Sequence, residues 1–339
     1  MTYDASYLLP LRRERHQEDP ELAAYLHQLS RELEVVVVDG SPPNVFADHH
    51  RQWGEHVVHV PVVSRCLNGK VAGIIDGVQV ATGELVVIAD DDVRYDDSVL
   101  RRVLELGASA DLVRPQNYFD PLPWHARWDT ARTLLNRAAG ADYPGTLVVR
   151  RAAFLKSNGY CGAVLFENLE LIRTLKAHGA REVLASDVYV RRLPPPAGHF
   201  RRQRVRQAYD SLAQPGRLAV ELSLLPTLAM ALTGRSGRSV VVVIAVASGV
   251  LAEVGRRRHR GSAVFSADAA LWAPLWVVER AVCIWLALAW RACGGVPYAG
   301  RRLRCAAHPT RRLSGSGCPE ECCSCEVAVR WASVVGMTS

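Results

Sequence analysis

Residues 81–100 read ATGELVVIADDDVRYDDSVL, and this stretch decides the fold. An uninterrupted apolar run, mostly β-branched, leads from Glu84 into three aspartates at 90–92. Such a run is typical of a strand that is buried on both faces of a parallel sheet. In open α/β sheets, ligands bind outside the carboxyl ends of the strands. The stretch therefore predicts a buried strand at 84–90 that ends at a binding site.

The first half of the chain repeats this pattern. Short apolar runs alternate with helical patterns, which is typical of strand–helix–strand units and an α/β fold. The run EVVVVD at 34–39 also ends in a carboxylate, Asp39. From about residue 111 to 119 the pattern is irregular. We expect strands at 6–11, 34–39, 56–62, 84–90 and 146–150, and helices at 17–31, 68–82, 96–108, 124–139, 167–179 and 199–212.

The positive charge of the chain is concentrated in one segment. The 339 residues include 41 Lys and Arg against 34 Asp and Glu, a formal charge of +7. Residues 200–312 carry +13, whereas residues 1–199 carry −4. The arginines flank apolar runs, as expected beside an anionic membrane surface. In a protein that binds nucleic acid, basic residues would instead gather on a polar or aromatic surface. We therefore expect a membrane partner and no nucleic acid.

Three apolar segments lie within this basic region, at 218–233, 239–252 and 271–290. The first two are short for a span, which needs about 20 residues, but they predict a transmembrane hairpin. RRRHR at 256–260 would hold it on the cytoplasmic side. The third contains four tryptophans and is expected to be interfacial or re-entrant, because a third span would place residues 301–312 outside. The alternative is a set of buried helices in a soluble domain.

The chain has nine cysteines, four of them in CPEECCSC at 318–325. This spacing is poor for a tetrahedral zinc site, so we expect a basic and then cysteine-rich, disordered tail over 301–339. The opening residues contain no apolar run of a signal peptide, which predicts a cytosolic location for the first 200 residues.

The aspartates at 90–92 favour a metal site. Asp90 and Asp92 are two residues apart and can both bind one hard cation that also binds pyrophosphate oxygens. The alternative is an acidic surface turn. Lys70, in NGK, is a candidate for nucleotide binding, with a solvated helix lysine as the alternative.

Between residues 8 and 212 the motifs resemble, in order, those of family-2 glycosyltransferases, which have the nucleotide-diphospho-sugar (GT-A) fold. LLPLR resembles the opening strand and its nucleotide-contacting turn, VVVVDGS the second strand, and IADDD the D-x-D motif. FENLEL resembles the acidic segment with the catalytic base, and QRVRQ resembles the Q-x-x-R-W motif of membrane-associated members. By this resemblance Pro10, Leu11, Asp39, Lys70 and Asp90 bind the nucleotide, Asp90 and Asp92 bind metal, and Glu167 or Glu170, Gln203 and Arg206 are catalytic.

The chain departs from the family pattern at two positions. Asn168 stands where the family has an aspartate, so the base must be Glu167 or Glu170. Gln207 replaces the usual tryptophan, which puts acceptor stacking in doubt. Arg206 is retained and could offset charge on the departing diphosphate.

The resemblance implies a GT-A fold with a Rossmann-like mixed sheet, followed by membrane-associated helices. It predicts a catalytic domain at 1–215, membrane helices at 216–300 and the tail at 301–339. The implied activity is the metal-dependent, inverting transfer of a sugar from a UDP- or GDP-sugar to a lipid-linked or glycan acceptor, with Mg²⁺ or Mn²⁺. It would occur at the cytoplasmic face of the cell membrane. The alternatives are an inactive membrane-anchored nucleotide-sugar-binding protein and a sugar nucleotidyltransferase, although the latter would need a glycine-rich loop after the first strand.

Overall fold

The computed structural model describes residues 3–234, 237–298 and 300–314. These residues form two compact units. Residues 315–339, with the predicted cysteine cluster, lie outside the described residues. Residues 301–314, which were expected to belong to a disordered tail, contain the strand Arg301–Leu303 and the short helix Thr310–Arg312. Of the described residues, the first unit contains 3–114, 145–184 and 308–314, and the second contains 115–144 and 185–307.

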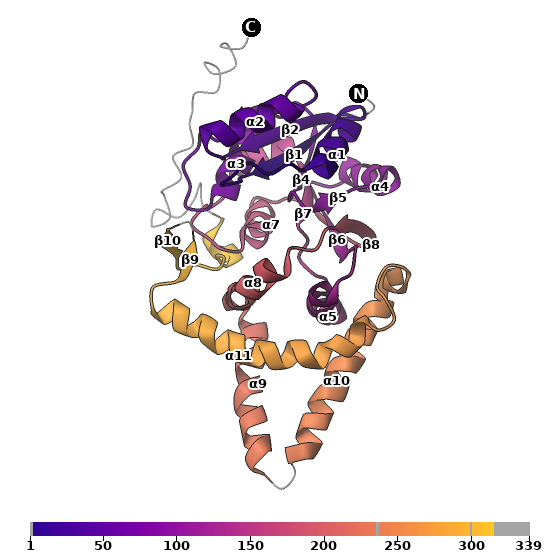
Figure 1. The fold of residues 1–339 in the computed structure, drawn as a ribbon, viewed down its shortest axis with the longest axis vertical. Coiled ribbons are helices and arrows are strands. Elements are labelled where there is room, and N and C mark those ends of the chain that lie inside the picture. Colours follow the sequence, from indigo (N-terminus) through magenta and orange to yellow (C-terminus); the bar gives the residue numbers. More distant parts are fainter. Residues whose placement is uncertain (1–2, 235–236, 299, 315–339) are drawn as a thin grey trace. The chain divides into compact units, whose positions relative to one another are not determined.

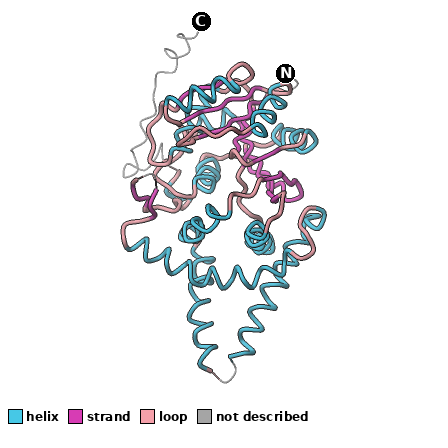
Figure 2. The backbone as a smooth tube through the Cα atoms, in the orientation of Figure 1, coloured by secondary structure: helices cyan, strands magenta, loops and turns pink. Residues whose placement is uncertain are grey.

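The first unit is built on a mixed sheet in which strands and helices alternate along the chain (Figure 2). The strand order is β3-β2-β1-β4-β7-β6-β8-β5, and β6 and β8 continue into the second unit. The first four strands pair in parallel, and β7 runs antiparallel to β4 and β6. The strands are β1 (Ala5–Leu11), β2 (Glu34–Asp39), β3 (Val58–Pro61), β4 (Leu85–Ala89), β5 (Val93–Arg94), β6 (Leu112–Phe119), β7 (Thr146–Arg150) and β8 (Glu182–Arg192).

The parallel pairing brings three strand ends to one edge of the sheet. Leu11 at the end of β1 is the partner of Asp39 at the end of β2. Ile88, near the end of β4, is the partner of Leu8. All five residues of β4 are buried, as the continuous apolar run predicts.

Helix α3 packs closely against β1 because it carries glycine at the contact. A Cβ at Gly77 would lie 2.1 Å from Leu8 Cδ1. This approach places the first turn of α3, with Lys70, beside the sheet edge described above. The helices of this unit are α1 (Pro20–Ser30), α2 (Pro43–Trp53), α3 (Gly69–Val80), α4 (Asp97–Ala108), α6 (Arg151–Lys156) and α7 (Glu167–Ala177) (Figure 1).

The second unit is mainly helical. Helices α9 and α10 form a hairpin, and α11 crosses them near the ends that lie away from their connecting turn (Figure 1). The core of this unit includes Ala131, Ala252, Trp276 and Val277. Its elements are α5 (Trp124–Ala139), α8 (Ala197–Tyr209), α9 (Pro215–Thr233), α10 (Gly237–Arg257), α11 (Ala273–Ala292), β9 (Val296–Tyr298) and β10 (Arg301–Leu303).

A buried arginine fastens α10 to α5. The guanidinium of Arg137 donates hydrogen bonds to the carbonyl oxygens of Gly255 and Arg258, at the carboxyl end of α10, and to Tyr189 Oη. Since the last carbonyls of a helix have no partner within it, Arg137 satisfies groups that would otherwise be buried unbonded.

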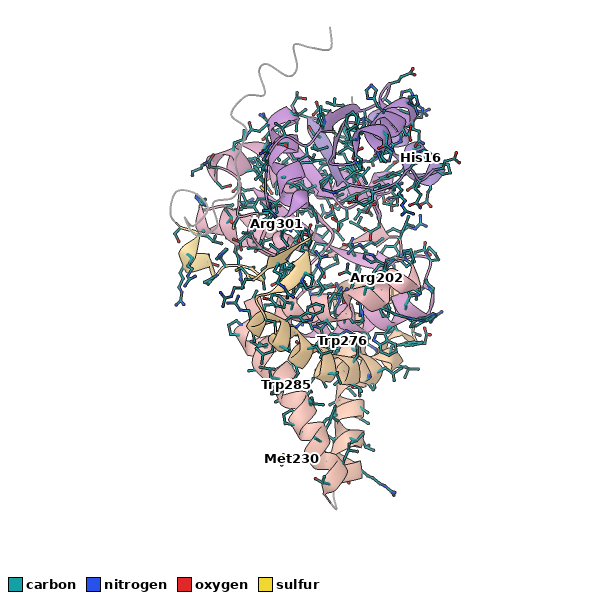
Figure 3. All side chains as sticks on the ribbon, turned by 60° about the vertical axis from the view of Figure 1, so that its left-hand side comes forward. His16, Arg202, Met230, Trp276, Trp285 and Arg301 are labelled. Carbon is teal, nitrogen blue, oxygen red and sulfur yellow. The ribbon has the colours of Figure 1, made fainter. Side chains whose placement is uncertain are left out.

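The hairpin exposes apolar side chains. Val242, Val243, Val246 and Val250 of α10 are each more than half exposed, and Met230 of α9 is 74% exposed. Met230 lies near the free end of the hairpin, while Trp276 and Trp285 of α11 lie near its other end (Figure 3). Three helices among the described residues are long and apolar enough to cross a membrane.

Candidate functional site

Three predicted site residues meet at the carboxyl end of β4. Lys70 Nζ lies 2.5 Å from Asp90 Oδ1 and 2.8 Å from Glu167 Oε1. The three side chains come from the start of α3, the end of β4 and the first residue of α7. Each is about a fifth exposed, so the site is open to a ligand.

Asn68 holds α3 and α7 together at this site. Its side-chain oxygen accepts a hydrogen bond from the backbone N–H of Lys70 and so caps α3. Its side-chain nitrogen donates to the carbonyl oxygen of Val164, in the loop before α7, and its backbone N–H donates to that of Gly162. Asn68 is not among the site residues predicted from the sequence. An asparagine immediately before a predicted helix is the pattern that could have indicated it.

The charges at the site stabilise one another. Burial alone would lower the pKa of Lys70, but the neighbouring carboxylates of Asp90 and Glu167 outweigh burial and raise it well above its ordinary value. Lys70 therefore stays protonated at any physiological pH. It supplies a fixed positive charge between two carboxylates, where a phosphate group can also be neutralised.

The other two aspartates of the triplet lie in different surroundings. Asp91 is exposed, with Oδ2 3.9 Å from a guanidinium nitrogen of Arg13. Asp92 is partly buried, directly before β5. The carboxylates of Asp90 and Asp92 are hard oxygen donors at a solvent-accessible strand end, and this donor set fits Mg²⁺ or Mn²⁺ with the remaining ligands supplied by water or phosphate.

Asp39 lies at the same sheet edge but is enclosed by histidines. Its Oδ2 accepts a hydrogen bond from His49 at 2.6 Å and lies 3.3 Å from His59 Nε2, and its Oδ1 accepts one from the backbone N–H of Ser41. Burial raises the pKa of Asp39, but the bonds to His59, Ser41 and His49 more than offset it, so the net shift is downward. Asp39 is therefore a fixed anion.

Pro10 and Leu11 form the end of β1, as the sequence predicts. Pro10 is partly buried and Leu11 is buried, and a Cβ at Gly73 of α3 would lie 3.0 Å from Pro10 Cβ. Their position next to Asp39 in the register keeps them at the edge that carries the site.

The two candidate bases of α7 have very different surroundings. Glu167 is near the surface and contacts Lys70. Glu170 is completely buried, and its two oxygens interact with the backbone N–H and Nδ1 of His308, each at 2.7 Å. A ligand can thus reach Glu167 in this structure but not Glu170.

Gln203 and Arg206 belong to α8 in the second unit. Gln203 Nε2 is 3.0 Å from His199 Nε2, and the Arg206 guanidinium stacks on the ring of Tyr298 at 4.9 Å. Gln207, which replaces the family's tryptophan, has a buried side-chain oxygen.

The chain matches the model of a known protein family. Residues 15–210 match the family model described as glycosyltransferase like family 2, which is more than half of the chain. No curated protein matches the chain significantly.

The chain also resembles solved structures, at low sequence identity. A mannosyltransferase from Pyrobaculum calidifontis in complex with GDP-mannose and Mn²⁺ is 17% identical with a TM-score of 0.48, over 83% of this chain and 87% of that chain. A mycobacterial protein is 15% identical with a TM-score of 0.39, over 58% and 69%. On the strength of the family match and of the mixed sheet that carries the ordered motifs, this chain belongs to glycosyltransferase family 2 and is a glycosyltransferase with the GT-A fold.

Proposed function

We propose that the chain transfers a sugar from a UDP- or GDP-sugar to a lipid-linked or glycan acceptor at the cytoplasmic face of the cell membrane, with inversion at the anomeric carbon. The observation that carries this proposal is the group formed by Lys70, Asp90 and Glu167 at the carboxyl end of β4. It combines a cation for a diphosphate, a carboxylate for a metal ion and a carboxylate for proton transfer at one strand end.

The donor side of the site neutralises a leaving diphosphate. Asp90 and Asp92 would hold Mg²⁺ or Mn²⁺, which when bound supplies positive charge to the pyrophosphate oxygens. Lys70 adds a permanent positive charge, and Arg206 of α8 is proposed to do the same. Pro10, Leu11 and Asp39 are proposed to contact the nucleotide. Positive charge at the site matters because stabilising the developing charge on the leaving group is a major part of the rate enhancement.

The acceptor side needs a base. Glu167 is proposed to take the proton of the acceptor hydroxyl, because its carboxylate is partly exposed and lies at the same site as Lys70. Glu170 is less suitable, because its carboxylate is fully buried and bonded to His308. Gln203 is proposed to help position the substrates from α8.

The proposed membrane attachment rests on α9 and α10. These helices have 19 and 21 residues, longer than the apolar runs from which they were predicted, because the helices continue through flanking glycine and arginine. At 1.5 Å per residue they extend about 28 and 31 Å, close to the roughly 30 Å hydrocarbon core of a bilayer, with the charged last turn of α10 at the membrane surface.

Helix α11 fits the membrane surface better than a third span. The two charged residues in the middle of α11 face the interior of the second unit, where Glu279 pairs with Arg204 at 3.7 Å and Arg280 is fully buried. Its exposed apolar residues recur every three or four positions and form one stripe, as in an interfacial helix. The stripe consists of Leu275, Val278, Val282, Trp285 and Leu286, and exposed Leu271 lies just before the helix.

Arginine distribution favours the cytoplasmic orientation. The sequence RRRHR at 256–260 lies at the carboxyl end of α10, and α8 carries four more arginines, whereas the sequence from 234 to 238 contains two, Arg235 and Arg238. Under the positive-inside rule, the end of the helical hairpin with more arginines faces the cytoplasm. We propose that the membrane-associated helices lie within the predicted segment 216–300. The predicted catalytic part at 1–215 contributes to both compact units, and residues 308–314 of the predicted tail belong to the first unit.

We expect the full chain to remain in the membrane fraction after a high-salt wash and to require detergent for release. Salt screens the contacts of arginines with anionic lipid, but it does not remove the inserted apolar surface of α9 and α10. Sedimentation followed by immunoblotting measures this. The full chain is used because residues 308–314 belong to the first unit, so a truncation after 215 would damage it. Release by salt alone would mean that the hairpin does not insert.

We expect the transferred sugar to enter a product that organic solvent extracts from membranes. The acceptor should be held at the bilayer, because the exposed hairpin keeps the enzyme there. Purified chain in detergent would be incubated with radiolabelled UDP- or GDP-sugar and a membrane lipid extract, with heat-inactivated chain as the control. Label that appears only in water-soluble glycans would instead support the glycan acceptor.

A further inference from the structure

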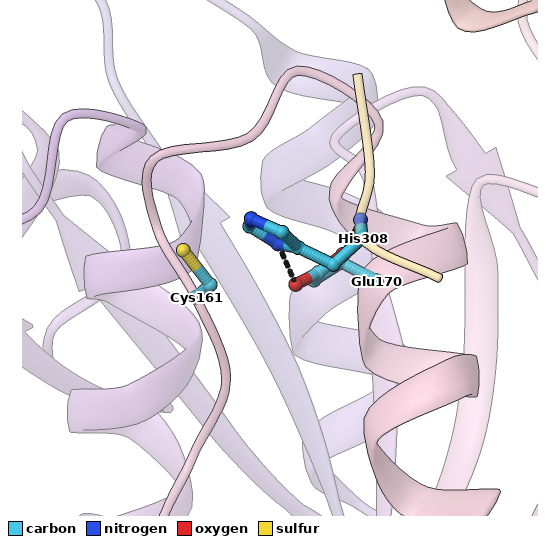
Figure 4. Close-up of side chains that lie close together, drawn as sticks. All are labelled: Cys161, Glu170 and His308. Carbon is cyan, nitrogen blue, oxygen red and sulfur yellow. Dashed lines mark hydrogen bonds and ion pairs between the residues drawn. The ribbon is translucent and has the colours of Figure 1, made fainter. Parts of the chain in front are cut away.

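A second group of metal-ligating side chains is made of residues other than the D-x-D aspartates. Cys161, Glu170 and His308 each present one ligand atom, and these atoms all lie within 4.8 Å of one another. All three side chains are buried. Figure 4 shows them converging from the loop before α7, from α7 itself and from the segment that follows β10.

The proposed function gives this group no role. Glu170 is 0% exposed, so its carboxylate needs compensation inside the first unit. His308 supplies it through its backbone N–H and its Nδ1, both 2.7 Å from the carboxylate oxygens. Arg173, one helical turn along α7, donates to the carbonyl oxygen of His308 at 2.8 Å and holds the segment in place.

The sulfur of Cys161 completes a mixed donor set. The Cys161 sulfur accepts a hydrogen bond from the backbone N–H of Ala163 at 3.4 Å, which fixes its position beside the other two side chains. Thiolate, imidazole and carboxylate together are typical ligands of Zn²⁺, whereas Mg²⁺ and Mn²⁺ prefer oxygen. This group and the aspartates at 90–92 therefore differ in the cation that they select.

Charge and geometry are both compatible with zinc. A zinc ion with one thiolate, one carboxylate and one neutral imidazole has no net charge, so the buried group stays neutral. Tetrahedral zinc, with bonds of about 2.0–2.3 Å, holds its ligand atoms roughly 3.3–3.8 Å apart, so side-chain shifts of about 1 Å suffice. Three protein ligands leave the fourth position for water or another ligand.

We propose that Cys161, Glu170 and His308 form a zinc site that fastens the segment beginning at His308 to α7. This segment contains the short helix Thr310–Arg312, which contacts α7. The metal would fix the helix whose first residue is Glu167, with water in the fourth position, and because its ligands are buried it takes no part in sugar transfer.

The test is cobalt substitution of the full chain. Co²⁺ bound to a thiolate gives a charge-transfer band in the near ultraviolet, which oxygen ligands such as Asp90 and Asp92 do not give. The tail cysteines Cys318, Cys322, Cys323 and Cys325 are replaced by serine, so that they cannot contribute. We expect one Co²⁺ per chain with this band, displaced by Zn²⁺, in the detergent-purified protein.

Single substitutions show which cysteine produces the charge-transfer band. Cys161→Ser should remove it, and Glu170→Gln should weaken Co²⁺ binding at least about tenfold, whereas Cys293→Ser, at an exposed thiol, and Asp92→Asn should leave it unchanged. Circular dichroism shows whether each variant is folded. If Cys161→Ser does not fold, His308→Ala replaces it and should lose the band. A wild-type chain that shows no thiolate band, or a band that persists in folded Cys161→Ser or His308→Ala, would overturn the proposal.

Discussion

Replacement of Asp92 by asparagine is expected to leave less than about a tenth of wild-type sugar transfer at saturating Mn²⁺, because the variant loses a carboxylate that would hold the metal ion against the diphosphate. Asp92 is partly buried, directly before β5, and the ion pair of Lys70 with Asp90 does not include it. The variant should fold, because asparagine has nearly the same size and shape as aspartate. Initial rates of transfer across a Mn²⁺ titration measure the effect.

Asp91→Asn is the matched control for this experiment. It makes the same chemical change one position earlier, at an exposed side chain whose charged neighbour is Arg13 at 3.9 Å. We expect Asp91→Asn to keep most of the activity. Asp92→Asn with more than about a tenth of wild-type activity, or equal losses in the two variants, would show that Asp92 is not a metal ligand.

Replacement of Glu167 by glutamine is expected to lower turnover by about 10²–10⁴-fold, the usual contribution of a general base. The amide oxygen of glutamine can still accept the hydrogen bond from Lys70 Nζ, so the variant keeps the local geometry while losing the ability to take a proton. The dissociation constant for the nucleoside diphosphate should change little. Single-turnover rates and equilibrium binding separate these two quantities.

Glu170→Gln, one turn along the same helix, distinguishes the two candidate bases. Glu170 is buried and hydrogen-bonded to His308. This substitution should therefore lower the thermal midpoint of unfolding more than it lowers the turnover of the folded enzyme. If Glu167→Gln remains active while folded Glu170→Gln is inactive, the base is Glu170 and our assignment is wrong.

The sequence predicts well those elements that have a continuous apolar core or a clear helical period. Strand β2 and helix α5 have the predicted bounds, and β4 differs by one residue at each end. These segments are buried along most of their length, so local hydrophobicity reports their structure directly.

Other elements were missed because tertiary contacts outweigh their local pattern. Helix α2, PNVFADHHRQW, is mostly polar and has few apolar residues to mark its buried face. Strand β6 contains Arg114 and Pro115 and was expected to be irregular, and β8 alternates buried and exposed residues around Asp187 and Arg191. Pairing with neighbouring strands stabilises β6 and β8, and a single sequence does not reveal such partners.

The same limit applies to the site. Lys70, Asp90 and Glu167 could each be singled out from a motif, but the contact between Lys70 and Glu167 joins residues 97 positions apart and requires the folded chain. The partner of Glu170 was still harder to foresee, since His308 lies 138 residues away, beyond the apolar helices. Glu167 and Glu170 both lie in the first turn of α7, so the sequence alone could not decide which of them is the catalytic base.

The most direct measurement of the central claim is the hydrolysis of a panel of UDP- and GDP-sugars by the detergent-purified full chain, with Mn²⁺, with EDTA and with the Asp92→Asn variant. We predict that at least one nucleotide sugar is hydrolysed in the presence of Mn²⁺, and that EDTA and Asp92→Asn both abolish this turnover. A chain that binds a nucleotide sugar tightly but never cleaves it would be a binding protein, and turnover that is indifferent to both EDTA and Asp92→Asn would contradict the proposed site.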